Sequence, residues 1–169
     1  MAIATSKWIE SDGGPLMVAS GSVAPAWSGT RPSKRPAEAS DYRRACAIRD
    51  DVGTVSIGVA DALILGDEPD STTVIASEGD IFLVRRRCAD SEDALRSKLH
   101  PALTCLPFMH ACSFRTVPGD HFLFDSAYPW DEVEEAIKLW LPASIYSVAT
   151  AHFAPDTSLS VLVHRLRRM

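Results

Sequence analysis

The side chains that could carry out nucleophilic chemistry are scattered along this sequence. Asp125 and Ser126 are adjacent and His121 lies nearby, a set from which a hydrolase could draw a nucleophile and a base. Cys46 or Cys112, paired with a histidine, could serve in the same way. A nucleophile and its base must lie within hydrogen-bond reach, and nothing in these spacings enforces that contact. We therefore assign no catalytic residue and keep a small hydrolase as the weakest of three functional alternatives.

The histidines and cysteines do not follow a metal-binding pattern. The five histidines show no His-x-x-x-His spacing, and the four cysteines include no Cys-x-x-Cys pair. His110 and Cys112 would point the same way from a strand, but two ligands do not make a zinc site. The sequence also lacks a phosphate-binding glycine loop, a dinucleotide fingerprint and a Gly-x-Ser-x-Gly elbow. We expect a protein that is not an enzyme and that has neither a metal nor a cofactor.

Acidic residues outnumber basic ones and are concentrated in part of the chain. There are 17 lysines and arginines against 22 aspartates and glutamates, a formal net charge of −5. This balance opposes sequence-independent binding of nucleic acid, which needs a basic surface. Residues 41–80 hold nine acids and three arginines, a local net charge of −6. An acidic patch of this kind attracts a basic protein partner and speeds its association.

Two groups of carboxylates are the candidates for binding such a partner. One is the turn at residues 66–70, which contains three acids and no base. The other is the acidic face of the segment at residues 129–140. The candidate partner-binding residues are Asp67, Glu68, Asp70, Glu132 and Glu135.

The length and composition are typical of one globular domain. The 169 residues, 46% hydrophobic and 23% charged, are enough to form a core, so we expect a single domain over residues 1–169. No apolar run approaches the roughly 20 residues of a membrane helix, and the first seven residues lack the pattern of a signal peptide. Four widely spaced cysteines suit a reducing compartment. We expect a cytoplasmic protein with no membrane partner.

The order of local signals predicts an α+β fold, mainly an antiparallel sheet built from hairpins. Turn residues at 118–120 and at 155–158 separate β-prone segments, so each is expected to close a hairpin. One helix is expected over residues 91–103, where Asp90 or Ser91 can cap the first turn. A second is expected over residues 129–140, because apolar residues recur there at helical spacing. These elements would form the scaffold that positions the acidic groups.

Residues 29–40 predict an irregular basic loop. Arg31, Lys34 and Arg35 alternate there with prolines, and no apolar periodicity is present. We expect this loop to be an exposed connection.

Five short blocks stand in order between Trp8 and Trp130. They are residues 8–16 (WIESDGGPL), 27–29 (W-x-G), 41–46 (D-Y-x-R-A-C), 62–69 (ALILGDEP) and 124–127 (FDSA). Together they resemble the immunity protein 21 family of bacterial polymorphic toxin systems. The resemblance does not extend to the basic loop or to the residues from Tyr146 onward.

This resemblance implies a cytoplasmic protein that binds and neutralises a cognate toxin. Such proteins are generally not enzymes and act by occluding the toxin's active site or a neighbouring surface. By analogy the toxin is expected to be a nuclease, whose basic substrate groove would suit an acidic inhibitor. The runner-up interpretation is an adaptor that binds a non-toxic protein.

The matching blocks contain residues with expected structural roles. Two glycines and a proline would form a tight turn, two tryptophans would anchor the core, and two aspartates would cap a helix or bind backbone amides. In that order they are Gly13, Gly14, Pro15, Trp8, Trp27, Asp41 and Asp125.

Overall fold

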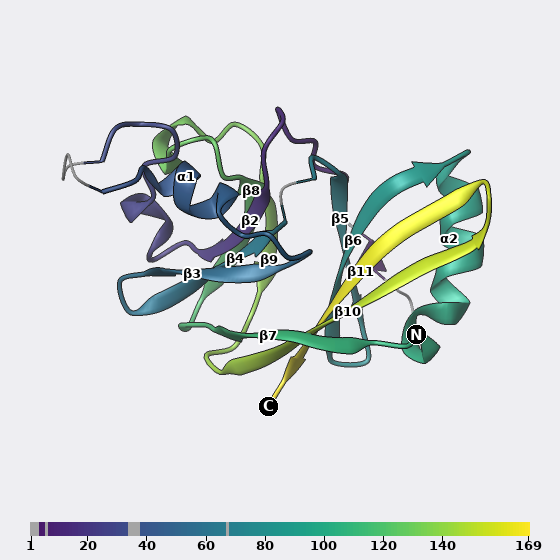
Figure 1. Cartoon of the computed structure of the whole chain (residues 1–169). Helices are drawn as coiled ribbons and strands as arrows, with labels where there is room; N and C mark the ends of the chain where they lie inside the picture. Colours follow the sequence, from purple (N-terminus) through teal and green to yellow (C-terminus); the bar gives the residue numbers. More distant parts are fainter. Residues whose placement is uncertain (1–3, 6, 34–37, 67) are drawn as a thin grey trace.

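Antiparallel strands dominate the structure, a computed structural model that describes residues 4–5, 7–33, 38–66 and 68–169. They form a six-stranded and a five-stranded sheet (Figure 1). The six-stranded sheet has the order β1 (Ala4–Thr5), β5 (Ser71–Ser77), β6 (Asp80–Ala89), β11 (Leu159–Arg168), β10 (Ile145–Asp156) and β7 (Met109–Arg115). The five-stranded sheet has the order β3 (Gly53–Ile57), β4 (Ala60–Leu65), β2 (Leu16–Ser20), β8 (Asp120–Asp125) and β9 (Ile137–Trp140). The expected α+β class is confirmed.

Within the described residues, two α-helices and three 3₁₀ turns accompany the sheets. They are α1 (Asp41–Cys46), α2 (Glu92–Ala102), η1 (Ala24–Ala26), η2 (Leu103–Cys105) and η3 (Trp130–Glu132). Helix α2 confirms the first expected helix, since the Ser91 side chain accepts the amide N–H of Ala94 at 3.1 Å. Helix α1 is capped by Ser40, whose hydroxyl accepts the Arg43 amide, so Asp41 is not the cap.

The second expected helix, over residues 129–140, is wrong. The chain forms η3, an irregular segment and then β9. Ile137 and Leu139 are buried while Lys138 and Trp140 are exposed, the alternation of a strand and not of a helix. Pairing with β8 overrides the local helical spacing. As a strand, β9 forms backbone hydrogen bonds with β8 and buries the side chains of Ile137 and Leu139 between the sheets.

One of the two expected hairpins is present. Strands β10 and β11 pair along most of their length around the turn at residues 157–158, which confirms the hairpin predicted at residues 155–158. The prediction of a hairpin at residues 118–120 is wrong, because β7 and β8 belong to different sheets. The turn there carries the chain from the six-stranded sheet to the five-stranded one. Its Pro-Gly-Asp sequence indicates a turn but does not indicate whether the two strands pair with each other.

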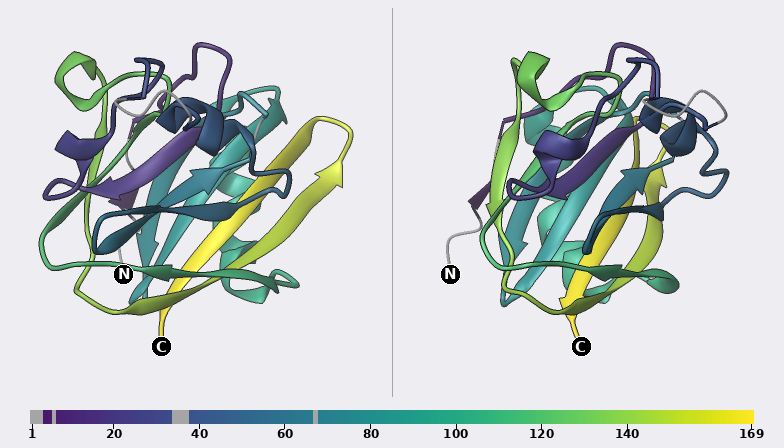
Figure 2. Two further views of the ribbon diagram at one scale, coloured as in Figure 1. Left: turned by 60° about the vertical axis from the view of Figure 1, so that its left-hand side comes forward. Right: turned by 90° about the vertical axis from the view of Figure 1, so that its left-hand side faces the viewer.

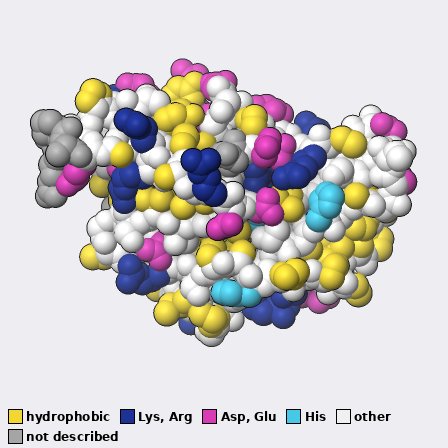
Figure 3. Space-filling model, in the orientation of Figure 1, with side chains coloured by type: hydrophobic (Ala, Val, Ile, Leu, Met, Phe, Trp, Pro, Cys, Tyr) yellow, Lys and Arg dark blue, Asp and Glu magenta, His cyan; other side chains and the backbone are white. Residues whose placement is uncertain are grey.

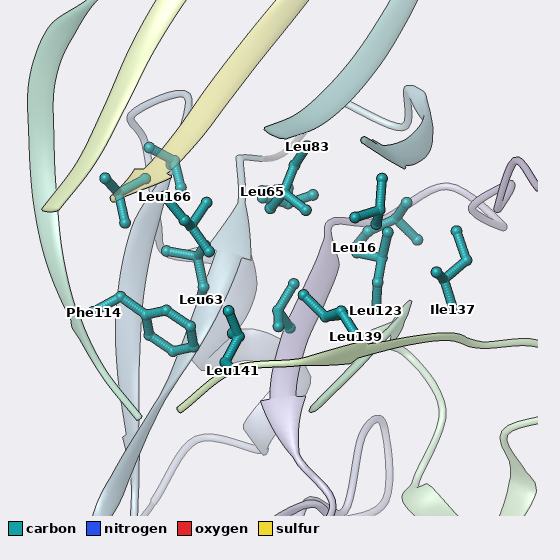
Figure 4. Close-up of a cluster of buried hydrophobic side chains, with 14 of the residues drawn as sticks. Leu16, Leu63, Leu65, Leu83, Phe114, Leu123, Ile137, Leu139, Leu141 and Leu166 are labelled. Carbon is teal, nitrogen blue, oxygen red and sulfur yellow. The ribbon is translucent and has the colours of Figure 1, made fainter. Parts of the chain in front are cut away.

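The main apolar core lies between the two sheets. Leu16, Leu63 and Leu123 of the five-stranded sheet meet Leu83 and Leu166 of the six-stranded sheet there (Figure 4). Each large side chain buried in this way stabilises the fold by roughly 1.5–3 kcal/mol. The shared cluster fixes the position of one sheet relative to the other.

Each sheet is covered on its outer face by a smaller apolar cluster. Leu95 and Leu99 of α2 pack on the six-stranded sheet. Trp27, with η1, α1 and the η3 region, packs on the five-stranded sheet. Among the described residues, no helix is long and apolar enough to cross a lipid bilayer. The segment before β2, helix α1 and η3 gather at one end of the molecule (Figure 2).

Candidate functional site

Asp125, at the end of β8, joins two loops that are distant in sequence. One carboxylate oxygen accepts the amide N–H of Asp12 at 2.8 Å, and the other accepts that of Ala127 at 2.9 Å. The next residue, Ser126, is fully buried and donates its hydroxyl to the carbonyl of Pro15 at 2.5 Å. The loop before β2 is therefore held against the turn after β8. We call this contact region the loop junction.

Trp27 and Gly29 bring a third segment to the loop junction. The indole Nε1 of buried Trp27 donates to the carbonyl of Ser126 at 2.8 Å. Gly29 has a φ of +56° and lies so close to the backbone of residues 127–129 that a Cβ atom would clash with it. Only glycine fits this position, because both the backbone conformation and the close approach exclude a side chain.

Helix α1 supplies the fourth segment of the loop junction. The Asp41 carboxylate accepts both the amide and the hydroxyl of Ser28 at 2.8 Å. The Tyr42 ring lies against Gly14, where an added Cβ would come within 2.7 Å of a ring carbon. The tight turn itself is closed by Ser11, whose hydroxyl accepts the amides of Gly13 and Gly14. Four of the blocks that carry the family resemblance thus meet at one place.

The two tryptophans expected in the core differ in burial. Trp27 is 1% exposed. Trp8 is only partly buried and lies at the margin of the cluster under α2, where the Arg86 guanidinium stacks 4.6 Å from its ring centre.

A pocket of about 550 Å³ opens beside the loop junction. Seven of its ten lining residues are acids, and we call it the carboxylate pocket. The lining residues are Ile9, Glu10, Asp12, Asp125, Tyr128, Asp131, Glu132, Val133, Glu134 and Glu135. Acidic side chains gather along the upper margin of the face in Figure 3, toward the end where the segments before β2 and after η3 lie in Figure 1.

Arg31 is the main counterion of this pocket in the structure. Its guanidinium binds both oxygens of Asp131 at 2.9 and 3.0 Å and also contacts Glu132. These hydrogen bonds raise the pKa of Arg31 and lower the pKa of Asp131. The predicted basic loop is thus represented at the pocket by Arg31, while its residues 34–37 lie outside the described part of the chain.

Other contacts leave the carboxylate pocket acidic. The ammonium of Lys7 lies 4.0 Å from Glu135, and Arg86 lies 3.6 Å from Glu10. Counting Arg31 as well, three cations face seven carboxylates within the described residues. The Tyr128 hydroxyl donates to the Asp12 carboxylate, and this hydrogen bond raises the pKa of Tyr128. The pocket therefore offers hydrogen-bond acceptors and negative charge to a cationic partner.

The structure separates the five predicted partner-binding residues. Glu132 and Glu135 are exposed and line the carboxylate pocket. Glu68 is exposed but is not among the lining residues, and Asp67 lies outside the described residues.

Asp70 is held by two arginines that the sequence does not place near its turn. Its carboxylate lies 3.8 Å from Arg85 and 3.5 Å from Arg87, both on β6. Arg85 is 1% exposed, and burial lowers its pKa although the charge of Asp70 opposes this effect. Asp70 thus balances a buried charge, and the turn at residues 66–70 does have basic neighbours.

Five acids of the pocket were not predicted from the sequence as partner-binding residues, and Asp125 among them was expected only in a structural role. Glu10 and Asp12 precede the two glycines of the turn, while Asp131 and Glu134 share the acidic segment with the two predicted glutamates. Their charge was visible in the sequence, but the approach of the two segments was not.

Ser126 and His121, the candidate nucleophile and base, are each bonded to a backbone carbonyl. His121 contacts the carbonyl of Gly119 through Nδ1 at 3.0 Å. Burial, with the charge of Asp61, raises the pKa of Cys112 to about 11, which disfavours its thiolate. Among the described residues, no group of three or more histidine, cysteine or acidic side chains could hold a metal ion.

Comparison with known proteins identifies the family. A family model described as immunity protein 21 matches residues 7–159, a range that includes the loop junction and the whole carboxylate pocket. The searches of curated proteins and of solved structures find no match. Because the family model covers most of the sequence, the chain belongs to the immunity protein 21 family.

Proposed function

We propose that this chain neutralises a cognate bacterial toxin by stoichiometric binding, without catalysis, and that the carboxylate pocket receives basic side chains of the toxin. Membership of the family implies a cognate toxin as the target. The observation that carries the choice of surface is the convergence of seven carboxylates in one pocket. A charge cluster of this density steers a basic partner and favours its retention.

The loop junction supports this proposal because its hydrogen bonds position two of the pocket's acids, Asp12 and Asp125. The Asp12 amide donates to the Asp125 carboxylate, and the Tyr128 hydroxyl donates to the Asp12 carboxylate. Carboxylates that are already ordered lose little conformational entropy when a partner binds. A fixed pocket also selects partners by the spacing of their basic groups.

A nuclease is the toxin class that we propose. Nucleases bind phosphate with clustered lysines and arginines, so a rigid acidic surface could cover that groove and exclude the substrate. We place this activity in the cytoplasm, where such a toxin would meet nucleic acid.

Co-expression tests the proposal directly. The probe is the toxin domain encoded beside this gene, produced in a bacterial host with and without this chain. The proposal predicts growth arrest by the toxin alone, rescue by co-expression and recovery of a one-to-one complex. Persistent arrest and no complex would contradict it, and a stable complex with a non-toxic protein would favour an adaptor.

A further inference from the structure

Strand β9 is one of the two edge strands of the five-stranded sheet, and β3 is the other. It pairs with β8 from Ile137 opposite Leu123 to Trp140 opposite Asp120. No other strand in the described residues pairs with it. An edge strand offers unpaired backbone N–H and C=O groups to another chain.

The outward face of β9 carries an exposed tryptophan. Trp140 is 66% exposed, although tryptophan is costly to leave in water. Its neighbour on that face, Lys138, binds Asp120 at 2.7 Å, so its charge is balanced within the sheet. Tryptophan is enriched at protein interfaces and among the residues that contribute most to binding energy.

The edge continues directly into the carboxylate pocket. Val133, Glu134 and Glu135 line the pocket, and β9 begins two residues later at Ile137. Ile137 also belongs to the same core cluster as Ile9, which lines the pocket. At about 3.3 Å per residue, two or three residues of an extended chain bridge the distance from β9 to Glu135 along the backbone.

We propose that an extended, basic segment of the toxin adds to β9 as a strand and places lysine or arginine side chains in the carboxylate pocket. This inference rests on the proposed function. Charge complementarity favours a basic segment, because the pocket repels an acidic one. The unpaired backbone of β9 favours binding of that segment as an added strand. An apolar side chain of the added strand packs on Trp140.

Hydrogen exchange tests the backbone pairing. The amides of residues 137–140 are compared in the full chain alone and in its complex with the toxin domain encoded beside this gene. The proposal predicts that exchange at the open edge slows by about tenfold or more in the complex. A complex in which β9 exchanges as in the free chain would overturn it.

A pair of exposed-residue variants tests the side-chain contact. Trp140→Ala should raise the dissociation constant by about tenfold or more. Val59→Ala is the matched control, since Val59 is 76% exposed in the β3–β4 turn, and should change it by less than about twofold. Circular dichroism and the urea midpoint establish that both variants are folded.

Two failures are distinguishable in these experiments. If the toxin domain binds the wild type and Trp140→Ala equally well, the proposal that the toxin docks on β9 is wrong and the proposed function stands. If the wild type does not bind the toxin domain, the proposed function is wrong and the proposal of docking on β9 with it.

Discussion

The carboxylate of Asp125 accepts the backbone N–H of Asp12 at 2.8 Å, joining residues 113 positions apart in the sequence. Its second oxygen accepts the amide of Ala127 two residues further on. The same side chain therefore positions both the segment around Asp12, which lines the carboxylate pocket, and the turn after β8. Family resemblance at residues 8–16 and 124–127 has a physical basis in this contact.

Removal of this carboxylate should destabilise the fold. Asp125→Ala leaves two amides without their charged acceptor, so we expect the free energy of unfolding to fall by about 2–4 kcal/mol. Asp125→Asn keeps one carbonyl acceptor and should lose about half as much. Urea denaturation measures both values. A loss below about 0.5 kcal/mol for Asp125→Ala would contradict the role of the loop junction.

Trp27 should be the most sensitive tryptophan. Trp27→Ala removes a fully buried ring, and we expect a loss of about 3–5 kcal/mol. Trp27→Phe keeps much of the packing and loses the bond to the Ser126 carbonyl, which should cost about 1–2 kcal/mol. The exposed Trp140 is the control, and Trp140→Ala should change stability by less than about 0.5 kcal/mol. Thermal unfolding that ranks the two alanine variants in the reverse order would refute this assignment.

Arg31 should compete with the basic groups of the toxin. It occupies Asp131 and Glu132 in the free protein, so Arg31→Ala exposes both carboxylates and makes the pocket more negative. We expect faster association with the toxin domain by about threefold at low ionic strength, and a smaller gain as salt screens the charges.

Arg43→Ala is the matched control for this experiment, since Arg43 is exposed on α1 and does not line the pocket. Stopped-flow or surface-binding kinetics give the association rates. Equal acceleration by both variants would show that net charge, and not the pocket, controls association.

His164 should make the fold sensitive to acid. Burial, together with the nearby charges of Arg85 and Arg87, lowers its pKa to about 3, against about 6.5 when unfolded. Because the unfolded chain binds the proton more readily, this contribution to stability is present above pH 6.5 and is lost progressively toward pH 3.

Replacement of His164 alone isolates its contribution, because the other four histidines are kept. His164→Gln retains a hydrogen-bonding group for Thr150, whose hydroxyl lies 2.8 Å from Nδ1. Its free energy of unfolding should fall less steeply than that of the wild type between pH 6.5 and pH 4. Parallel curves from urea titrations at each pH would exclude His164 as a source of acid sensitivity.

Elements with strong local signals could be predicted from the sequence. Helix α2 has a serine cap and apolar residues on one face, and the β10–β11 hairpin has turn residues between two long β-prone segments. The segment at residues 129–140 lacked a decisive local signal. Its helical spacing and the strand alternation of Ile137 and Leu139 coexist, and only pairing with β8, a non-local contact, decides between them.

The site was predictable in charge but not in geometry. Glu132 and Glu135 stand out as part of an acidic run, and the structure places them in the pocket. The turn at residues 66–70 is also an acidic run, yet Asp70 is paired with Arg85 and Arg87 of β6, a strand that begins ten residues later. Which carboxylates face solvent and which balance a buried cation depends on the packing of the sheets.

The most direct test of the central claim measures the affinity of the toxin domain for two variants with the same change in net charge. Glu132→Gln, Glu134→Gln and Glu135→Gln together neutralise the pocket wall. The control combines Glu68→Gln, Glu78→Gln and Asp90→Asn, which are exposed acids outside the pocket.

At low ionic strength, the pocket variant should raise the dissociation constant by about 30-fold, or about 2 kcal/mol, and the control by less than about threefold. Equal weakening by the two variants, or no weakening by the pocket variant, would contradict the assignment of the carboxylate pocket as the toxin-binding surface.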